Sequence, residues 1–167
     1  MLKYYISFVL LLITSSLQAQ VESELYERVI DATIDRTVPT VSVDQLLKFD
    51  YSSFVFLDTR AKEEFEQSRI KNAHWVGYDN FKNKRLPEMS KSDTIVLYCS
   101  IGYRSEKIGE RLQKLGYTDV YNLYGGIFEW VNRDLPVYNQ SNVKTDTVHA
   151  YSVGWGIWLN KGVKVYE

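Results

Sequence analysis

The sequence predicts an α/β protein with a small, mainly parallel sheet flanked by helices. Two continuous apolar runs, Phe54–Asp58 and Thr94–Cys99, have the length and the branched and aromatic residues typical of buried strands. A segment with helical spacing follows each run, and strands that alternate with helices favour a parallel sheet. The chain has 167 residues, of which 45% are apolar, which is enough for one domain with a proper core.

The first segment, residues 1–19, predicts a secretory signal peptide. Lys3 supplies a short positive region, Tyr4–Ile13 is apolar except for Ser7, and a small and polar segment ends at Ala19. The apolar stretch is shorter than the ~20 residues that a spanning helix needs, although an uncleaved membrane anchor is the alternative. We therefore expect an exported protein, periplasmic or secreted, with no stable membrane span in the mature chain.

Residues 20–40 predict a helical segment that leads into the domain. Its apolar residues recur at helical spacing with charges between them, and they are Val21, Leu25, Val29 and Ile30. Pro39 ends this helix, an extended piece covers Thr40–Val43, and a short helix begins near Asp44.

The domain itself is expected over residues 41–138. After the first strand we expect a helix over 61–70, a short strand over 73–76 and a connecting loop over 79–93. After the second strand, residues 104–117 predict a helix with an apolar stripe of Ile108, Leu112 and Leu115 and a C-terminal cap at Gly116. A third strand over 119–123 is followed by a Gly-Gly turn, a short helix and Pro136.

The last segment, residues 139–167, is an aromatic C-terminal extension. Its apolar residues fit helical spacing (Tyr151, Trp155, Trp158, Leu159) and also strand spacing. We expect a short helix, then a turn near 160–162 and an extended end. So much Trp and Tyr predicts that the extension packs on the domain.

Composition excludes several classes of site. A formal net charge of −1 gives no indication of binding to nucleic acid or anionic lipid. A single cysteine excludes a disulfide within the chain and a cysteine metal cluster. His74 and His149 lack a metal-ligand spacing, so we expect no metal and no cofactor.

The single cysteine, Cys99, lies where the second buried strand ends and a glycine-containing loop begins. In α/β sheets, ligands bind beyond the carboxyl ends of the strands. The loop Ser100, Ile101, Gly102, Tyr103, Arg104 and Ser105 leads into a helix, where backbone N–H groups and Arg104 favour a thiolate. A buried structural cysteine is the alternative, but the strand–loop–helix context, the glycine and the arginine together favour a reactive thiol.

Four segments carry a resemblance to the single-domain rhodanese-like sulfurtransferases. They read CSIGYRS from Cys99, LDTRAKEEF from Leu57, RIKNAHWV from Arg69 and LYGGIFEWVNRDLPV from Leu123. The first resembles the family's Cys-x-x-Gly-x-Arg loop, and the others follow in the family's order. Arg69 and Asn72 depart from the family's usual His and Gly. The lead-in helix and the extension lie outside the resemblance.

The resemblance implies sulfur transfer in two half-reactions. The Cys99 thiolate would take the outer sulfur of a donor such as thiosulfate, and the persulfide would pass it to a thiol or to cyanide. The loop from Ser100 to Ser105 would hold the persulfide. Six residues from Cys99 to Arg104 favour sulfur transfer, because the family's phosphatases and arsenate reductases have a loop one residue longer.

Asp58 and Arg60 follow the first strand on the same sheet edge as Cys99. Arg60 would add positive potential or contact the donor, or else both residues tie down neighbouring loops. Tyr103 and Ile101 would line the loop mouth, and Ile101 argues against a small dianion as the favoured donor. Glu64 is expected in a structural ion pair and Trp130 in the core.

Two other function classes stay open. One is a non-catalytic module that binds a protein partner through the C-terminal extension, with Cys99 incidental or a redox sensor. The weaker one is a phosphatase or arsenate reductase, which the loop length opposes.

Overall fold

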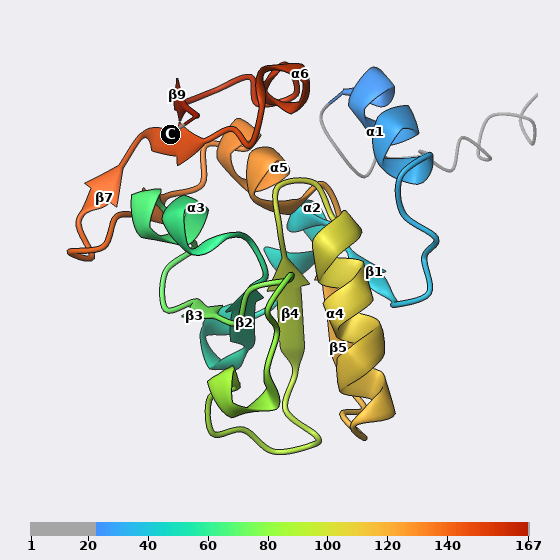
Figure 1. The fold of residues 1–167 in the computed structure, drawn as a ribbon. Coiled ribbons are helices and arrows are strands. Elements are labelled where there is room, and N and C mark those ends of the chain that lie inside the picture. Colours follow the sequence, from blue (N-terminus) through green and yellow to red (C-terminus); the bar gives the residue numbers. More distant parts are fainter. Residues whose placement is uncertain (1–22, 167) are drawn as a thin grey trace, which may run out of the picture.

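A computed structural model describes residues 23–166, so the expected signal peptide and Val21 lie outside the described part (Figure 1). A five-stranded parallel sheet forms the centre, in the order β1-β5-β4-β2-β3. Its strands are β1 (Thr40–Val41), β2 (Val55–Asp58), β3 (His74–Trp75), β4 (Ile95–Tyr98) and β5 (Val120–Leu123). The predicted fold class is confirmed.

Six α-helices flank this sheet and its extensions in the described part of the chain. They are α1 (Glu24–Asp31), α2 (Val43–Leu46), α3 (Lys62–Gln67), α4 (Tyr103–Lys114), α5 (Gly126–Asn132) and α6 (Val153–Gly156). Two 3₁₀ turns, η1 (Tyr51–Ser53) and η2 (Asn83–Arg85), lie in connections. The loop predicted over 79–93 therefore contains one short turn.

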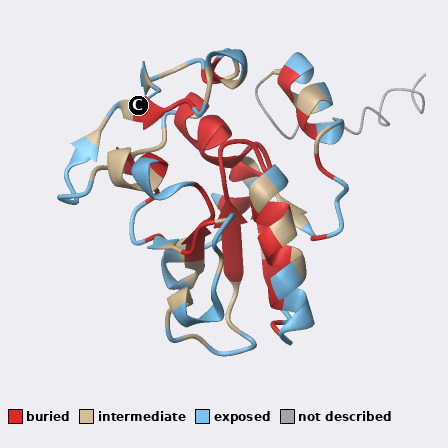
Figure 2. Cartoon of the chain, viewed as in Figure 1, coloured by how far each residue is buried: buried red, intermediate tan, exposed pale blue. Residues whose placement is uncertain are grey.

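The central strand β4 is buried on both faces, as Figure 2 shows. Val96 and Tyr98 point into the core shared with α1, α2 and α5. Ile95 and Leu97 point into a second core that contains Ile108 of α4. Successive side chains of a strand alternate between faces, so β4 supplies both cores and its carboxyl end is held from both sides.

Two helical stripes differ from the prediction. In α1, Tyr26 and Ile30 are buried, whereas Leu25 is 65% exposed. In α4, Ile108 and Leu112 are buried, but Leu115 is 39% exposed, because it is the C-terminal cap of the helix and no longer points along its buried face. Gly116 follows with a φ of +87°, the left-handed conformation expected of a glycine at this place.

The lead-in helix α1 is fastened to the domain by Tyr26. Its hydroxyl donates to the Gly125 carbonyl at 2.9 Å, and its ring stacks on Trp158 with centroids 5.6 Å apart. The N- and C-terminal segments outside the central domain therefore contact each other.

The C-terminal extension packs on the domain, as predicted. In the extension, β7 (Lys144–Thr145) pairs with β6 (Val137–Tyr138), which lies at the end of the expected domain. The strand β8 (Thr147–His149) pairs in parallel with β9 (Val163–Val165). Val148, Ala150 and Leu159 are fully buried in the core of α1 and α5. The short helix, turn and extended end predicted here are present. Across residues 23–166, no helix is both long and apolar enough to span a membrane.

Candidate active site

Cys99 follows β4 directly, and its loop curls back over the sulfur. The Gly102 N–H donates to the Cys99 Sγ at 3.1 Å, and α4 begins at Tyr103. Gly102 has a φ of +131°, a conformation that L residues with side chains rarely adopt. The glycine predicted to let the loop curl is therefore required by its backbone conformation.

Asn122 of the neighbouring strand β5 binds the loop through two hydrogen bonds. Its Nδ2 donates to the Gly102 carbonyl at 2.9 Å, and its Oδ1 lies 2.7 Å from the Ser105 hydroxyl. Asn122 and Ser105 are both fully buried. A buried amide with its partners satisfied holds the loop in one conformation.

The start of α5 supports the other end of the loop. The Ile127 N–H donates to the Cys99 carbonyl at 2.9 Å, and the Phe128 N–H donates to the Ser100 carbonyl at 3.2 Å. Gly126 has a φ of +56°, and a Cβ there would lie 2.5 Å from the Cys99 carbonyl oxygen. The Gly-Gly turn is therefore needed for close approach of the helix to the cysteine as well as for the turn itself.

The surroundings of Cys99 favour its thiolate. Burial raises the pKa of this thiol, but the charge of Arg104 and the backbone N–H groups of Ser105, Gly102 and Ile101 outweigh burial and lower the pKa below its ordinary value. The thiolate is the reactive form of cysteine, and a lowered pKa increases its fraction at neutral pH.

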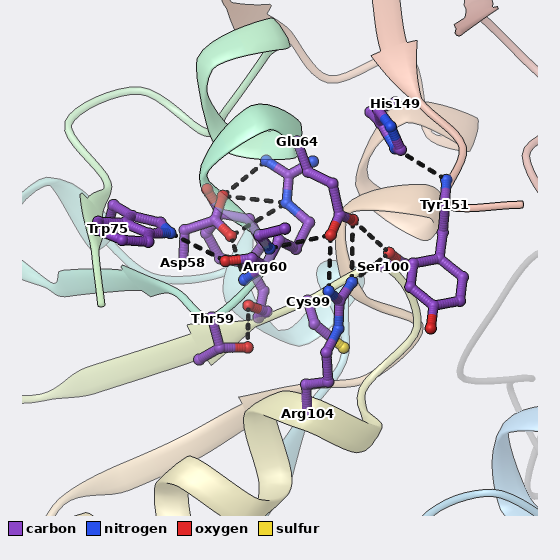
Figure 3. A network of polar contacts seen from close by, with 12 residues as sticks. Asp58, Thr59, Arg60, Glu64, Trp75, Cys99, Ser100, Arg104, His149 and Tyr151 are labelled. Carbon is purple, nitrogen blue, oxygen red and sulfur yellow. Dashed lines mark hydrogen bonds and ion pairs between the residues drawn. The ribbon is translucent and has the colours of Figure 1, made fainter. Parts of the chain in front are cut away.

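Arg104 is held by Glu64 of α3 in a two-point ion pair (Figure 3). Its Nη1 lies 2.6 Å from Glu64 Oε2, and its Nη2 lies 2.9 Å from Oε1 and 3.0 Å from the Ser100 hydroxyl. Burial raises the pKa of Glu64, but the hydrogen bonds and charge of Arg104 lower it on balance. The guanidinium therefore has a fixed position beside the loop.

Asp58 and Arg60 form a second pair, which is completely buried. The Arg60 guanidinium contacts both Asp58 carboxylate oxygens and donates to the Ser68 carbonyl, and both side chains are 0% exposed. Burial lowers the pKa of Arg60, but the Asp58 charge outweighs burial and raises the pKa above its ordinary value. With no exposed side-chain surface, this pair connects the end of β2 with the end of α3.

A pocket of about 480 Å³ opens onto the sulfur. Its walls come from the cysteine loop, from the end of the lead-in segment and from the extension. They comprise Ala32, Thr33, Cys99, Ser100, Ile101, Tyr103, Arg104, Tyr151 and Trp155. Tyr151 covers the Arg104 guanidinium, with the carbon at its centre 4.9 Å from the ring centroid.

Several residues of this site were not predicted. The sequence predicts a structural ion pair for Glu64 but gives no indication that its partner is Arg104. The position of Glu64 three residues after Ala61, whose N–H it accepts at 2.9 Å, identifies only a helix cap. The tertiary fold brings four further residues to the pocket, and no local sequence pattern predicts their place there. They are Ala32, Thr33, Tyr151 and Trp155.

The two histidines lie in separate surroundings. The His149 Nδ1 accepts a hydrogen bond from the Tyr151 N–H at 3.1 Å, while His74 is exposed in β3. Between residues 23 and 166 no group of three or more His, Cys, Asp or Glu side chains is arranged to hold a metal ion.

A family model described as "Rhodanese-like domain" matches residues 42–133, more than half of the chain. The match begins after the lead-in segment and ends before the extension. Both segments that complete the pocket from outside the cysteine loop therefore lie beyond the family match.

Individual relatives match the same region. A tRNA uridine(34) hydroxylase of Erwinia tasmaniensis is 32% identical over 121 residues, 64% of this chain and 34% of that enzyme. The chain thus spans about a third of that relative. Rhodanese-like domain-containing protein 17 of Arabidopsis thaliana is 31% identical over 113 residues, 60% of this chain and 72% of that protein. The structure of a human single-domain sulfurtransferase has a TM-score of 0.50 at 23% identity, covering 57% of this chain and 96% of that one, which shows the common fold.

Proposed function

The chain belongs to the rhodanese-like domain family, and from that premise we propose that it is a sulfurtransferase in which Cys99 carries the transferred sulfur as a persulfide. The observation that carries this proposal is the loop around the sulfur. The Gly102 N–H lies 3.1 Å from Cys99 Sγ, and Arg104 together with the loop N–H groups lowers the thiol pKa. The site therefore has an activated nucleophile and donors for an anion.

In the first half-reaction the Cys99 thiolate attacks the outer sulfur of a donor such as thiosulfate. A sulfur–sulfur bond forms to Cys99, the bond inside the donor breaks, and sulfite leaves with the bonding electron pair. The loop N–H groups that stabilise the thiolate then face the persulfide anion.

In the second half-reaction an acceptor attacks the outer sulfur of the persulfide. A thiol or cyanide takes that sulfur, and the Cys99 thiolate is regenerated. One cysteine is sufficient for this cycle, and donor and acceptor use the same site in turn.

The test is turnover with thiosulfate and cyanide, measured as thiocyanate. Plots of reciprocal rate against reciprocal donor concentration at several cyanide concentrations should be parallel. Cys99→Ser should abolish turnover, while Ser92→Ala, an exposed change on a distant loop, should not alter it. Thiocyanate production that survives Cys99→Ser would contradict the assignment of the nucleophile.

Two further proposals accompany this one. The apolar segment at residues 4–13 supports export, for which protease protection of the protein in intact cells is the test. Binding of a protein partner is the second candidate function, because Val153 and Ile157 of the extension are 74% and 60% exposed. A tRNA-directed role, suggested by the hydroxylase relatives, is less compatible with a net charge of −1.

A further inference from the structure

Four of the nine described residues that line the Cys99 pocket come from segments outside the family match. Ala32 and Thr33 end the lead-in segment, and Tyr151 and Trp155 belong to the extension. The family match spans residues 42–133 and contains none of these four. Substrate selection in this pocket can therefore differ from that of the common domain.

The pocket offers little free positive charge. Among the residues between 23 and 166 that line it, Arg104 is the only arginine, lysine or carboxylate. Both of its terminal nitrogens contact Glu64, and Tyr151 lies over its guanidinium. A small dianion loses its hydration on entering such a pocket, and it competes with Glu64 for the Arg104 guanidinium.

The pocket offers apolar surface instead. Its lining includes Ile101, the half-buried Trp155 and the exposed ring of Tyr103. Aromatic and aliphatic walls contribute binding energy in proportion to the apolar area that a ligand buries. The volume of about 480 Å³ is that of a site for a small organic molecule.

We propose that this pocket selects sulfane-sulfur donors that have an apolar organic body and at most one negative charge, such as organic thiosulfonates and persulfides, and that Tyr151 and Trp155 set this preference. The inference rests on the proposed function, since it concerns the donor of the same half-reaction. The apolar body lies against Trp155 and Ile101, and the outer sulfur faces Cys99.

The chemistry balances with a thiosulfonate donor, R–SO₂–S⁻. The Cys99 thiolate bonds to the outer sulfur, and the sulfur–sulfur bond of the donor breaks. The sulfinate R–SO₂⁻ leaves with the electron pair, and Cys99–S–S⁻ remains. Two negative charges are present before and after the step, and no external oxidant or reductant is needed.

The experiment compares benzenethiosulfonate with methanethiosulfonate, which share charge and reacting atoms and differ in the apolar body. Rates of Cys99 persulfidation are followed by intact-protein mass, and each is divided by the rate of the same donor with a free thiol in solution. We expect the protein to prefer benzenethiosulfonate by roughly tenfold or more after this correction. Thiosulfate, corrected in the same way, should be the poorest donor.

Trp155→Ala should reduce the corrected preference to about twofold or less. Ile157→Ala is the matched control, because Ile157 is an apolar residue of the same segment that does not line the pocket. Tyr151→Ala is the second pocket variant, and it repeats the test if Trp155→Ala does not fold, because the Tyr151 side chain is 50% exposed. It should also raise the relative rate with thiosulfate.

The outcomes separate this inference from the proposed function. A corrected preference near one in the wild-type protein, or a preference that the pocket variants leave unchanged, would overturn the selectivity while leaving sulfur transfer in place. Failure of every donor to add sulfur to Cys99 would overturn the proposed function itself.

Discussion

Two carboxylate–arginine pairs lie at the carboxyl edge of the sheet, and they differ in access to solvent. The Asp58–Arg60 pair is 0% exposed on both sides. In the Glu64–Arg104 pair, the arginine side chain is 16% exposed and lines the pocket, while Glu64 is 3% exposed. The same kind of ion pair is therefore completely buried in one case and borders the pocket in the other.

The two pairs have the same residue types and differ in burial and in what each guanidinium contacts. Arg60 uses its guanidinium to connect Asp58 with the Ser68 carbonyl. Arg104 uses its guanidinium to connect Glu64 with the cysteine loop and lowers the pKa of Cys99. Removing each arginine should therefore produce a different kind of loss.

The largest expected effect is on stability, from Arg60→Met. This change leaves the Asp58 carboxylate buried without its partner, which costs about 3–5 kcal/mol of unfolding free energy. Urea denaturation measures the loss. Lys62→Met is the matched control, since Lys62 is exposed and its pair with Glu66 contributes less than about 1 kcal/mol. Equal losses in the two variants would mean that the buried Asp58–Arg60 pair contributes no more to stability than the exposed Lys62–Glu66 pair.

The next effect is on reactivity, from Arg104→Met. Without this charge the pKa of Cys99 should rise, and alkylation by iodoacetamide at neutral pH should slow roughly tenfold for each pKa unit gained. The pH profile of alkylation measures it. Arg104→Lys should restore part of the rate, because a lysine keeps the charge but loses the two-point contact with Glu64. An unchanged profile in Arg104→Met would contradict the role of Arg104.

A smaller effect should appear in the pH dependence of stability. The pKa of Cys99 is lowered on folding, so ionisation stabilises the folded state. This contribution is complete above the unfolded-state pKa of about 8.5 and is lost as the pH falls through the folded-state pKa. The stability difference between wild type and Cys99→Ser should therefore increase as the pH rises through this window.

The pH dependence should also depend on Arg104 and not on Arg60. It should shrink when both proteins carry Arg104→Met and persist when both carry Arg60→Met. Denaturation midpoints across the window provide the readout. A difference that decreases as the pH rises would mean that folding raises the thiol pKa.

The smallest expected effect comes from Tyr151→Leu. This change removes the ring over Arg104 and should cost about 0.5–1 kcal/mol of unfolding free energy, the usual value of an exposed cation–π contact. Tyr151→Phe keeps the ring and should retain the wild-type midpoint. A loss in the Phe variant as large as in the Leu variant would assign the effect to the hydroxyl group.

The sheet and the cysteine loop could be predicted because their signals are local. The apolar run of β4 and the Cys-x-x-Gly-x-Arg loop occupy adjacent residues, so each pattern is visible in one stretch of the sequence. The buried face of α1 could not be predicted correctly, because Leu25 and Tyr26 are adjacent and either could face the domain. Which of the two is buried depends on the tertiary contact that the helix makes. The partner in that contact, Trp158, is far away in the chain.

The pocket walls could not be predicted for the same reason. Glu64 meets Arg104 across 40 residues of sequence, through the packing of α3 against the loop. The apolar residues of the segment that carries Tyr151 and Trp155 fit both helical and strand spacing, so the pattern does not determine its conformation. Their place beside Cys99 depends on the burial of Val148 and Leu159 in the core.

The most direct test of sulfur transfer through Cys99 is the intact mass of the reduced protein after incubation with a donor and then with cyanide. We predict that thiosulfate or benzenethiosulfonate adds the mass of one sulfur atom, that cyanide removes it, and that Cys99→Ser never gains it. A protein that gains no sulfur from either donor, or a Cys99→Ser variant that gains it as the wild type does, would contradict the account.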